Sequence, residues 1–224
     1  MKSFLNGMID LNKYTFVENF FNKRMYLINN FVSNISATDY ITNYRDVSKF
    51  IVFCKQCNKY NNCWACPPYD FDMDGYLSGY ESVYIIGTKI SLSENVRLKC
   101  VEAEISRRTG AGIIADVRHE LDKQLLKLES KYPDSKAFFA GTCHLCPDND
   151  CTRIKGQLCR YPDKIRHSLE SFGFDIAKTT TDLLHIELKW SNNGLLPEYL
   201  TLVSGFFTNY SIDNQDIKEC FPHN

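Results

Sequence analysis

The chain has 224 residues, of which 44% are hydrophobic and 24% charged, so it can bury a substantial core and does not have the composition of a disordered polypeptide. Twenty-six Lys and Arg residues against 27 Asp and Glu residues give a net charge of −1, which offers no global positive field to nucleic acid or an anionic membrane. Because no apolar run is long enough to span a bilayer and the first residues do not resemble a secretory signal, we expect a cytoplasmic protein without nucleic-acid or membrane partners.

The N-terminal part of the chain is predicted to be helical. Its apolar residues recur at spacings of three and four over residues 14–33, which is typical of an amphipathic helix: Phe16, Val17, Phe20, Phe21, Met25, Ile28 and Val32. We therefore expect residues 1–36 to form a helical appendage and residues 37–224 to form the main domain. A strand is predicted at residues 39–43, and an irregular loop then extends to Pro68.

The middle of the chain shows a clear strand and a long helix. Residues 83–90 are a mostly apolar run that fits a buried strand. Ser93 or Asn95 is suited to cap the following helix, in which a break is predicted at residues 109–112 because two glycines lie there. One face of this helix is apolar and is expected to pack on the core: Val117, Leu121, Leu125 and Leu128.

The C-terminal half is predicted to contain a short helix and three strands. The strands are expected at residues 136–141, 184–190 and 199–207, the last two as a hairpin, and the helix from Pro162 to Gly173. This order of elements predicts an α+β fold: a mixed sheet with helices on one face and two cysteine-rich metal-binding loops.

Two groups of four cysteines dominate the sequence. The first has the spacing C-x2-C-x5-C-x2-C and the second C-x2-C-x4-C-x7-C, and together they use eight of the ten cysteines: Cys54, Cys57, Cys63 and Cys66, then Cys143, Cys146, Cys151 and Cys159. A reducing compartment disfavours disulfides, whereas thiolate quartets within short loops suit zinc or an iron–sulfur cluster. The sequence therefore predicts these eight residues as the ligands of two metal centres.

The surroundings of the cysteines favour iron–sulfur clusters over zinc. The first group has too short a middle spacer for an ordinary zinc ribbon, and the second has only one C-x2-C pair. Proline follows Cys66 and Cys146, as it follows a ligand in bacterial ferredoxin loops. The aromatic residues Tyr60, Trp64 and Tyr69 would shelter a cluster at the first site. Two zinc ions that staple loops for binding a partner are the alternative.

Cys159 is the ligand with the weakest support, because seven residues separate it from Cys151. An open iron at this second site would make the protein an enzyme, with Arg153, Lys155 and Arg160 as substrate contacts. We nevertheless expect Cys159 to bind metal, since the helix predicted from Pro162 would stabilise a nearby thiolate. Four thiolates leave no iron vacant, so the prediction favours a carrier of electrons.

Other candidate residues are secondary. His144, inside the second C-x2-C turn, could replace a cysteine or donate a hydrogen bond to cluster sulfur. Glu170 is expected to pair with Arg166 one helical turn earlier, with a proton-shuttle role as the alternative. Cys100 and Cys220 are expected to be thiols outside both centres. Nucleotide-binding and nucleophile motifs are absent from the sequence, so it supports no nucleotide cofactor and identifies no catalytic residue.

One family resembles this chain over residues 38–207. The resemblance is carried by Cys66-Pro67-Pro68, by residues 141–159, and by Arg160, Pro162, Arg166, Ser168, Leu169, Glu170 and Gly173; His167 stands where proline is more usual. The family consists of uncharacterised, predicted metal-binding, cysteine-rich proteins of anaerobic bacteria and archaea. The resemblance implies a metal protein, consistent with two [4Fe-4S] clusters, and no established reaction.

The combined prediction is a protein of anaerobic metabolism that binds two [4Fe-4S] clusters and serves redox or electron transfer. Its partner would be a redox protein or a small-molecule substrate. The sequence does not decide whether the protein is an enzyme. If it is one, the predicted clusters indicate an iron–sulfur oxidoreductase.

Overall fold

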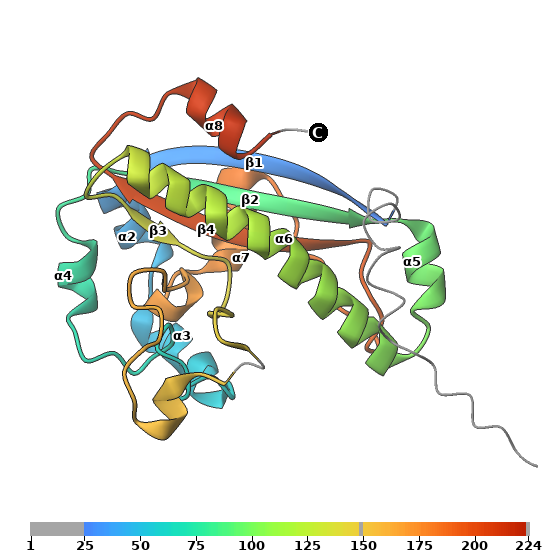
Figure 1. Cartoon of the computed structure of the whole chain (residues 1–224). Coiled ribbons are helices and arrows are strands. Elements are labelled where there is room, and N and C mark those ends of the chain that lie inside the picture. The colour runs from blue at the N-terminus through green and yellow to red at the C-terminus, as the bar shows by residue number, and fades with distance from the viewer. Residues whose placement is uncertain (1–24, 148–149, 223–224) are drawn as a thin grey trace, which may run out of the picture.

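An antiparallel sheet forms the centre of the computed structural model, which describes residues 25–147 and 150–222 (Figure 1). Its strands have the order β1-β2-β4-β3 and span Tyr26–Ser36 (β1), Ser82–Leu92 (β2), Lys136–Phe138 (β3) and Tyr199–Thr208 (β4). Strand β1 pairs with β2 along its whole length, from Tyr26 opposite Leu92 to Ser36 opposite Ser82. The predicted strands at residues 83–90, 136–141 and 199–207 are confirmed as β2, β3 and β4, although β3 is shorter than predicted.

Helices cover both faces of the sheet. The long helix α6, Ala103–Lys131, lies across one face together with α8, Asn214–Cys220, as Figure 1 shows. The opposite face packs against α2 (Ala37–Tyr44), α4 (Met73–Leu77), α7 (Ile176–Leu184) and the 3₁₀ turn η5 (Glu170–Phe172). Alternation along β2 explains this division, because Ile86 and Ile90 face α6 whereas Val83 and Ile85 face the other layer.

The α+β class is confirmed, and two of its details differ from the expectation. Each pairing among the described strands is antiparallel, where a mixed sheet was predicted. Helices lie on both faces of the sheet, where one covered face was predicted. In the described part of the chain, no helix is both long and apolar enough to cross a membrane.

The prediction of a helix over residues 14–33 is wrong in its described part, because residues 26–36 form strand β1. Residues 1–24, the rest of the predicted appendage, lie outside the described residues. The spacing of Ile28 and Val32 suits a helix, but pairing with β2 satisfies the backbone and overrides that local pattern.

The predicted strand at residues 39–43 is also wrong, because these residues belong to helix α2. The hydroxyl of Ser36 caps this helix by accepting a hydrogen bond from the amide of Asp39, which lies in the first turn. Ser93 does cap a helix, but it is the short α5, Glu94–Lys99. Helix α6 continues through residues 109–112 without the predicted break, and its predicted apolar face is buried: Val117, Leu121, Leu125 and Leu128.

Two predicted elements in the C-terminal half are absent from the described structure. No helix extends from Pro162 to Gly173; a turn at residues 162–164 and the 3₁₀ turn η5 occur instead. Residues 185–190 form no strand, and β4 pairs with β2 and β3 rather than in the predicted hairpin. The alternating pattern that predicted a strand is still seen in the burial of these side chains. Leu184 and Ile186 are buried, whereas His185 and Glu187 are exposed.

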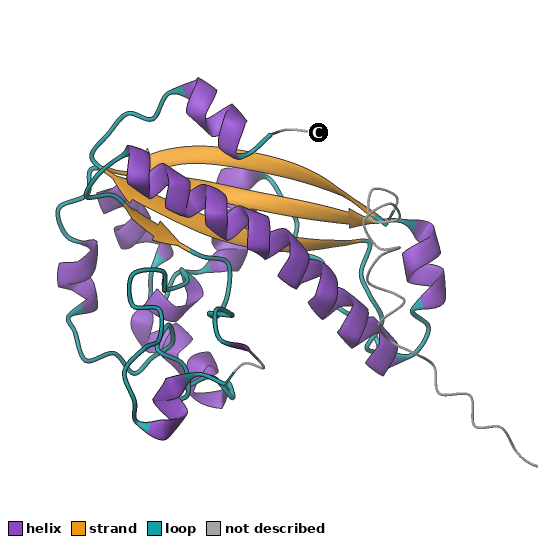
Figure 2. Cartoon of the chain, viewed as in Figure 1, coloured by secondary structure: helices purple, strands orange, loops and turns teal. Residues whose placement is uncertain are grey.

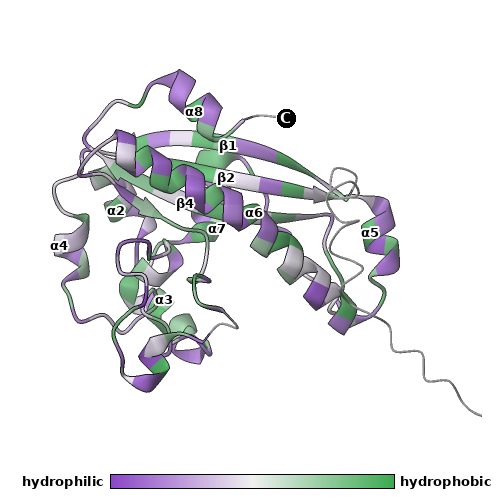
Figure 3. Ribbon diagram, viewed as in Figure 1, coloured by the Kyte–Doolittle hydropathy of each residue, from purple (hydrophilic) through white to green (hydrophobic). Residues whose placement is uncertain are grey.

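The cysteine-rich segments gather beyond strand β3. Figure 2 shows this region as mostly loops with a few short helices, in contrast to the regular sheet and α6. Its regular elements are α3, Val47–Gln56, and the 3₁₀ turn η4, Thr152–Lys155. Figure 3 shows hydrophobic and hydrophilic residues alternating along α6, whose buried residues include Val117, Leu121, Leu125 and Leu128. The core thus lies around the sheet, and the loops are held by specific contacts.

Candidate metal centre

Helix α3 carries the first cysteine and is placed by a close contact with Gly173. Cys54 lies in the last turn of α3, so the predicted irregular loop begins later than expected. The amide of Asp46 donates to the carbonyl oxygen of Gly173 at 2.8 Å. Gly173 has φ +84°, and a Cβ there would lie 2.7 Å from Cα of Val47. Glycine is therefore required for α3 to approach this closely.

A buried charged pair on α6 supports the second cysteine loop. Arg118 and Asp122 are both buried, and Nη1 of Arg118 donates to the carbonyl oxygen of Thr142 at 2.6 Å. Oδ2 of Asp122 lies 3.4 Å from Nη2 of Arg118 and 3.2 Å from Nε2 of His144. His144 thus contacts a carboxylate rather than a sulfur atom. Sequence reasoning missed this pair, although two opposite charges at i and i+4 beside Val117 and Leu121 could have revealed it.

Arg153 connects the two cysteine loops. Its Nη1 donates to the carbonyl oxygens of Cys63 at 2.9 Å and Cys66 at 2.6 Å, and its guanidinium lies 5.0 Å from the ring centre of Trp64. Nε1 of Trp64 donates in turn to the carbonyl oxygen of Gln157 at 3.0 Å. Arg153, predicted as a substrate contact, is therefore occupied in joining the loops.

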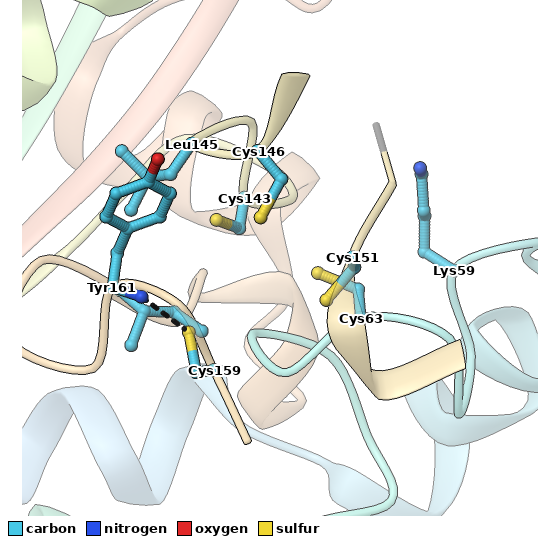
Figure 4. A pocket seen from close by; sticks show the side chains of 9 residues that line it. Lys59, Cys63, Cys143, Leu145, Cys146, Cys151, Cys159 and Tyr161 are labelled. Carbon is cyan, nitrogen blue, oxygen red and sulfur yellow. Dashed lines mark hydrogen bonds between the residues drawn. The ribbon is translucent and has the colours of Figure 1, made fainter. Parts of the chain in front are cut away.

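The second site collects five cysteines rather than four. Cys63, from the first sequence group, lines the same space as the whole second group, together with Lys59, Leu145, Tyr161 and Ile165. Figure 4 shows these five cysteine side chains arranged around one space, and they come from loops far apart in the sequence. Cys63 is only 2% exposed, so the orientation of its side chain is fixed by the residues packed around it.

The other three cysteines line a separate cavity. Cys54, Cys57 and Cys66 line an open cavity of about 380 Å³, which Asn58 and Lys59 also border. Its other walls include Tyr60, Thr142, Ser168, Glu170 and Ser171. The structure thus divides the eight predicted ligands into five and three, where the sequence suggested four and four.

Cys63 is the point at which the two sets meet. Oγ1 of Thr142 lies 3.2 Å from Sγ of Cys66 and 3.5 Å from Sγ of Cys63. Hydrogen bonds from the thiols of Cys143 and Cys66 hold the pKa of Cys63 well below its ordinary value. The same contacts, together with burial, raise the pKa values of the Cys66 and Cys143 thiols. One thiolate is therefore stabilised between the two sets.

Cys159 lacks the predicted helix beside it. Because no helix begins at Pro162, its thiolate gains no help from a helix terminus; the amide of Tyr161 lies 3.4 Å from its sulfur instead. Desolvation is the largest effect on Cys159 and raises the pKa of this thiol. Lys155 forms an ion pair with Asp150 at 2.9 Å. Arg160 pairs with the same carboxylate and also bonds to the Cys146 sulfur.

Glu170 does not form the predicted ion pair with Arg166. Nε of Arg166 donates instead to Oε1 of Glu129 at 2.8 Å, on α6. Glu170 is exposed at the open cavity beside Cys54, and desolvation by the surrounding protein raises the pKa of its carboxyl. A hydrogen bond from Ser168 opposes the shift.

The remaining candidates lie apart from the sulfur atoms or have structural contacts. Cys100 and Cys220 are buried in the core on the α6 side of the sheet. Nδ1 of His167 lies 3.2 Å from the carbonyl oxygen of Ala65, between Cys63 and Cys66. Among the predicted aromatic residues, Tyr60 lines the first cavity, and the hydroxyl of Tyr69 donates to the carbonyl oxygen of Ala65 at 2.8 Å.

The donors available at both sites suit a soft metal or a cluster. Thiolates are the preferred ligands of zinc and of iron–sulfur clusters. Within the described residues, no three side chains of Cys, His, Asp or Glu meet closely enough to hold a single metal ion. Cysteines on a cluster bind different iron atoms and so need not converge on one point. The thiolates of both sets are therefore donors of the kind that zinc and iron–sulfur clusters take.

The chain belongs to a family of predicted metal-binding proteins. The family model, described as "Predicted metal-binding protein (DUF2284)", matches residues 35–205, which is most of the chain and includes all eight cysteines. Neither the curated proteins nor the solved structures contain a match. The family, whose function is unknown, is described as predicted to bind metal, and membership agrees with the resemblance seen in the sequence.

Proposed function

We propose that this protein binds two [4Fe-4S] clusters and carries electrons to or from a redox partner in the cytoplasm. A bound cluster supplies one-electron chemistry, and the protein supplies thiolates, hydrogen bonds and shelter from water. The eight ligands are the cysteines of the two sets: Cys54, Cys57 and Cys66, with Cys63, Cys143, Cys146, Cys151 and Cys159.

The observation that carries this proposal is the contact between the two sets at Cys63. Thr142 contacts sulfur atoms of Cys66 and Cys63, and Cys63 accepts a hydrogen bond from Cys143. Two centres so close together allow an electron to cross from one to the other. Zinc has no redox chemistry, so two structural zinc ions would have no functional reason to lie this close together.

The protein environment of the second set supports the same conclusion. Arg160 bonds to the sulfur of Cys146, and the amide of Tyr161 lies 3.4 Å from the sulfur of Cys159. Hydrogen bonds to sulfur stabilise the more negative, reduced form of a cluster and so tune its reduction potential. Five sulfur atoms around this space also make an open iron here, the enzyme alternative raised by the sequence, unfavourable.

Metal analysis of anaerobically purified protein tests the proposal. Two cubanes require about eight iron and eight sulfide per chain. After reduction, two neighbouring paramagnetic clusters should couple and broaden each other's electron paramagnetic resonance signals. A colourless sample with two zinc ions per chain would overturn the proposal in favour of the zinc-stapled module.

A further inference from the structure

We infer that an acidic electron-carrier protein docks on the surface around the second cysteine set. This docking surface is formed by exposed parts of six residues: Lys59, Ile154, Lys155, Leu158, Tyr161 and Lys164. The inference rests on the proposed function, because it assumes that a cluster at this site exchanges electrons. It adds the chemistry of the partner and the place where the partner binds.

Charge is distributed unevenly along the chain. The two segments that carry the eight cysteines, residues 47–69 and 142–168, contain eight Lys and Arg residues and three Asp residues, a net charge of +5. The whole chain has a net charge of −1, so the remaining residues have a net charge of −6. A cationic region on an otherwise anionic chain directs an acidic partner to one part of the molecule.

Part of this positive charge is used inside the protein. Arg166 forms an ion pair with Glu129, and Arg153 donates to backbone carbonyl oxygens of the first cysteine loop. Arg160 bonds to the sulfur of Cys146, so its charge is partly taken up by the second cysteine set. These three arginines therefore stabilise the loops and do not define the docking surface.

The lysines of the two loops remain available to a partner. Within the described parts of the chain, neither Lys59 nor Lys164 forms an ion pair. Lys155 does pair with Asp150, but this single carboxylate is shared with Arg160 and leaves one positive charge unbalanced. A bound cluster is itself anionic, but it would lie beneath the exposed lysines, so a partner within a Debye length of about 8 Å meets the lysine charges first.

Apolar side chains lie among these lysines. Leu158 is 87% exposed and Ile154 is 57% exposed, and Tyr161 lines the space around which the five cysteines are arranged. Single exposed apolar residues are common, but these three belong to one loop beside the sulfur atoms. Small, transient electron-transfer interfaces combine such apolar contacts, which hold the complex, with charges that guide the encounter.

The docking surface borders both cysteine sets. Lys59 and Tyr161 lie on opposite sides of the five cysteines in Figure 4, and Lys59 also lines the cavity of the first set. Nε1 of Trp64 donates to the carbonyl oxygen of Gln157, which fixes the backbone next to Leu158 against the first loop. A protein docked here lies close enough to the sulfur atoms for an electron to cross. This position favours an electron carrier over nucleic acid, whose phosphates would bring no electron acceptor.

Electron transfer to two small proteins of opposite charge tests the inference. Rubredoxin is acidic and cytochrome c is basic, and each changes colour when one electron passes from the reduced cluster to its Fe³⁺. With the full chain reduced anaerobically, the second-order rate of rubredoxin reduction in stopped flow should fall about tenfold as the Debye length shortens from about 30 Å to about 8 Å. The rate with cytochrome c should not fall. A rubredoxin rate that is independent of salt, or that rises with salt, would overturn the inference.

Two pairs of variants locate the docking surface. Leu158→Ala should slow rubredoxin reduction about threefold and leave Tm unchanged, because the side chain has little burial to lose. Leu98→Ala is the matched control: Leu98 is 65% exposed on α5, which Figure 1 shows far from the cysteine loops. Lys164→Gln should slow the reaction at low salt and reduce its salt dependence, whereas Lys99→Gln on α5 should do neither. Equal effects within either pair would contradict the assignment.

The redox chemistry is measured separately with duroquinone, a small uncharged acceptor that needs no docking surface. Its reduction rate should be the same in the wild-type protein and in the four variants. A sample without iron, or one that reduces none of the acceptors, removes the proposed function and the docking surface together. A sample that reduces duroquinone, but whose rubredoxin rate ignores salt and substitution, removes only the docking surface. Binding of single-stranded DNA that Lys164→Gln weakens, with an unchanged rubredoxin rate, would assign the surface to nucleic acid and overturn the inference.

Discussion

The second cysteine set is tied to the core of the protein, whereas the first set borders open cavities. Five sulfur atoms surround the second space, and its loop is anchored to α6 through Arg118, Asp122 and His144. The first set has three sulfur atoms and a cavity of about 380 Å³ beside them. Its support is the packing of α3 against Gly173 and the bonds from Arg153.

The two neighbouring sites therefore differ in how firmly the protein holds them and in how far solvent reaches them. A site with surplus thiolates and a buried anchor is suited to hold a cluster rigidly and pass electrons. A site beside an open cavity is more accessible to solvent and to small reagents. The following predictions test whether the two sites differ in this way.

The largest effect is expected from removing a cysteine of the first set. Cys66→Ser should lower the iron content from about eight to about four per chain, because the first set offers only Cys54 and Cys57 besides the shared Cys63. Cys159→Ser should lose clearly less iron, since four other sulfur atoms remain around the second space. Iron and sulfide analysis under anaerobic conditions measures both. Cys100→Ser, in the core, is the control and should retain all iron; equal losses at positions 66 and 159 would contradict the difference between the sites.

The next largest effect is expected at the anchor of the second loop. Asp122→Ala leaves the buried Arg118 without its carboxylate and should cost about 3 kcal/mol of unfolding free energy. Denaturant unfolding of the anaerobic protein measures this loss, and the second cluster's spectrum should change more than the first. Glu120→Ala, on the exposed side of the same helix, is the matched control and should leave stability unchanged. A similar loss in both variants would show that α6 is sensitive in general.

A glycine substitution should damage the first site selectively. Gly173→Ala combines left-handed strain with a collision against Val47, for a total of about 2 kcal/mol or more, and should displace α3 and Cys54. Gly156→Ala has the same kind of strain, with φ +64°, but nothing within 4 Å of the added Cβ, so it should cost only about 1 kcal/mol. Melting curves together with the spectrum of the first cluster distinguish the two. An unchanged spectrum of the first cluster in Gly173→Ala would mean that α3 does not position the site.

The smallest effect is expected where the two sites are joined. Arg153→Lys keeps the charge but loses the fork that reaches several carbonyl oxygens, which should cost about 1 kcal/mol. Weaker magnetic coupling between the reduced clusters should accompany this loss. Arg107→Lys, in an exposed pair with Glu104, should change neither quantity. An unchanged coupling in Arg153→Lys would show that Arg153 does not set the distance between the sites.

Much of the regular structure was predictable from local pattern. The apolar run of β2, the face of α6 made by Val117, Leu121 and Leu125, and strand β4 all follow from the burial that their residue order allows. Residues 26–33 and 39–43 were predicted in the wrong state, because backbone pairing with β2 and a cap by Ser36 outweigh weak local preferences.

The sequence by itself placed the chain in a family of predicted metal-binding proteins and identified eight cysteines as candidate ligands, because ligand type and short spacing are local properties. How those cysteines are shared between the sites was decided only by the tertiary structure. Arg153 and Thr142 lie far along the chain from Cys63, and both contact it where the two sets meet. The cysteine spacing cannot predict where the Cys63 side chain lies, because its position depends on contacts between segments about 80 to 90 residues apart.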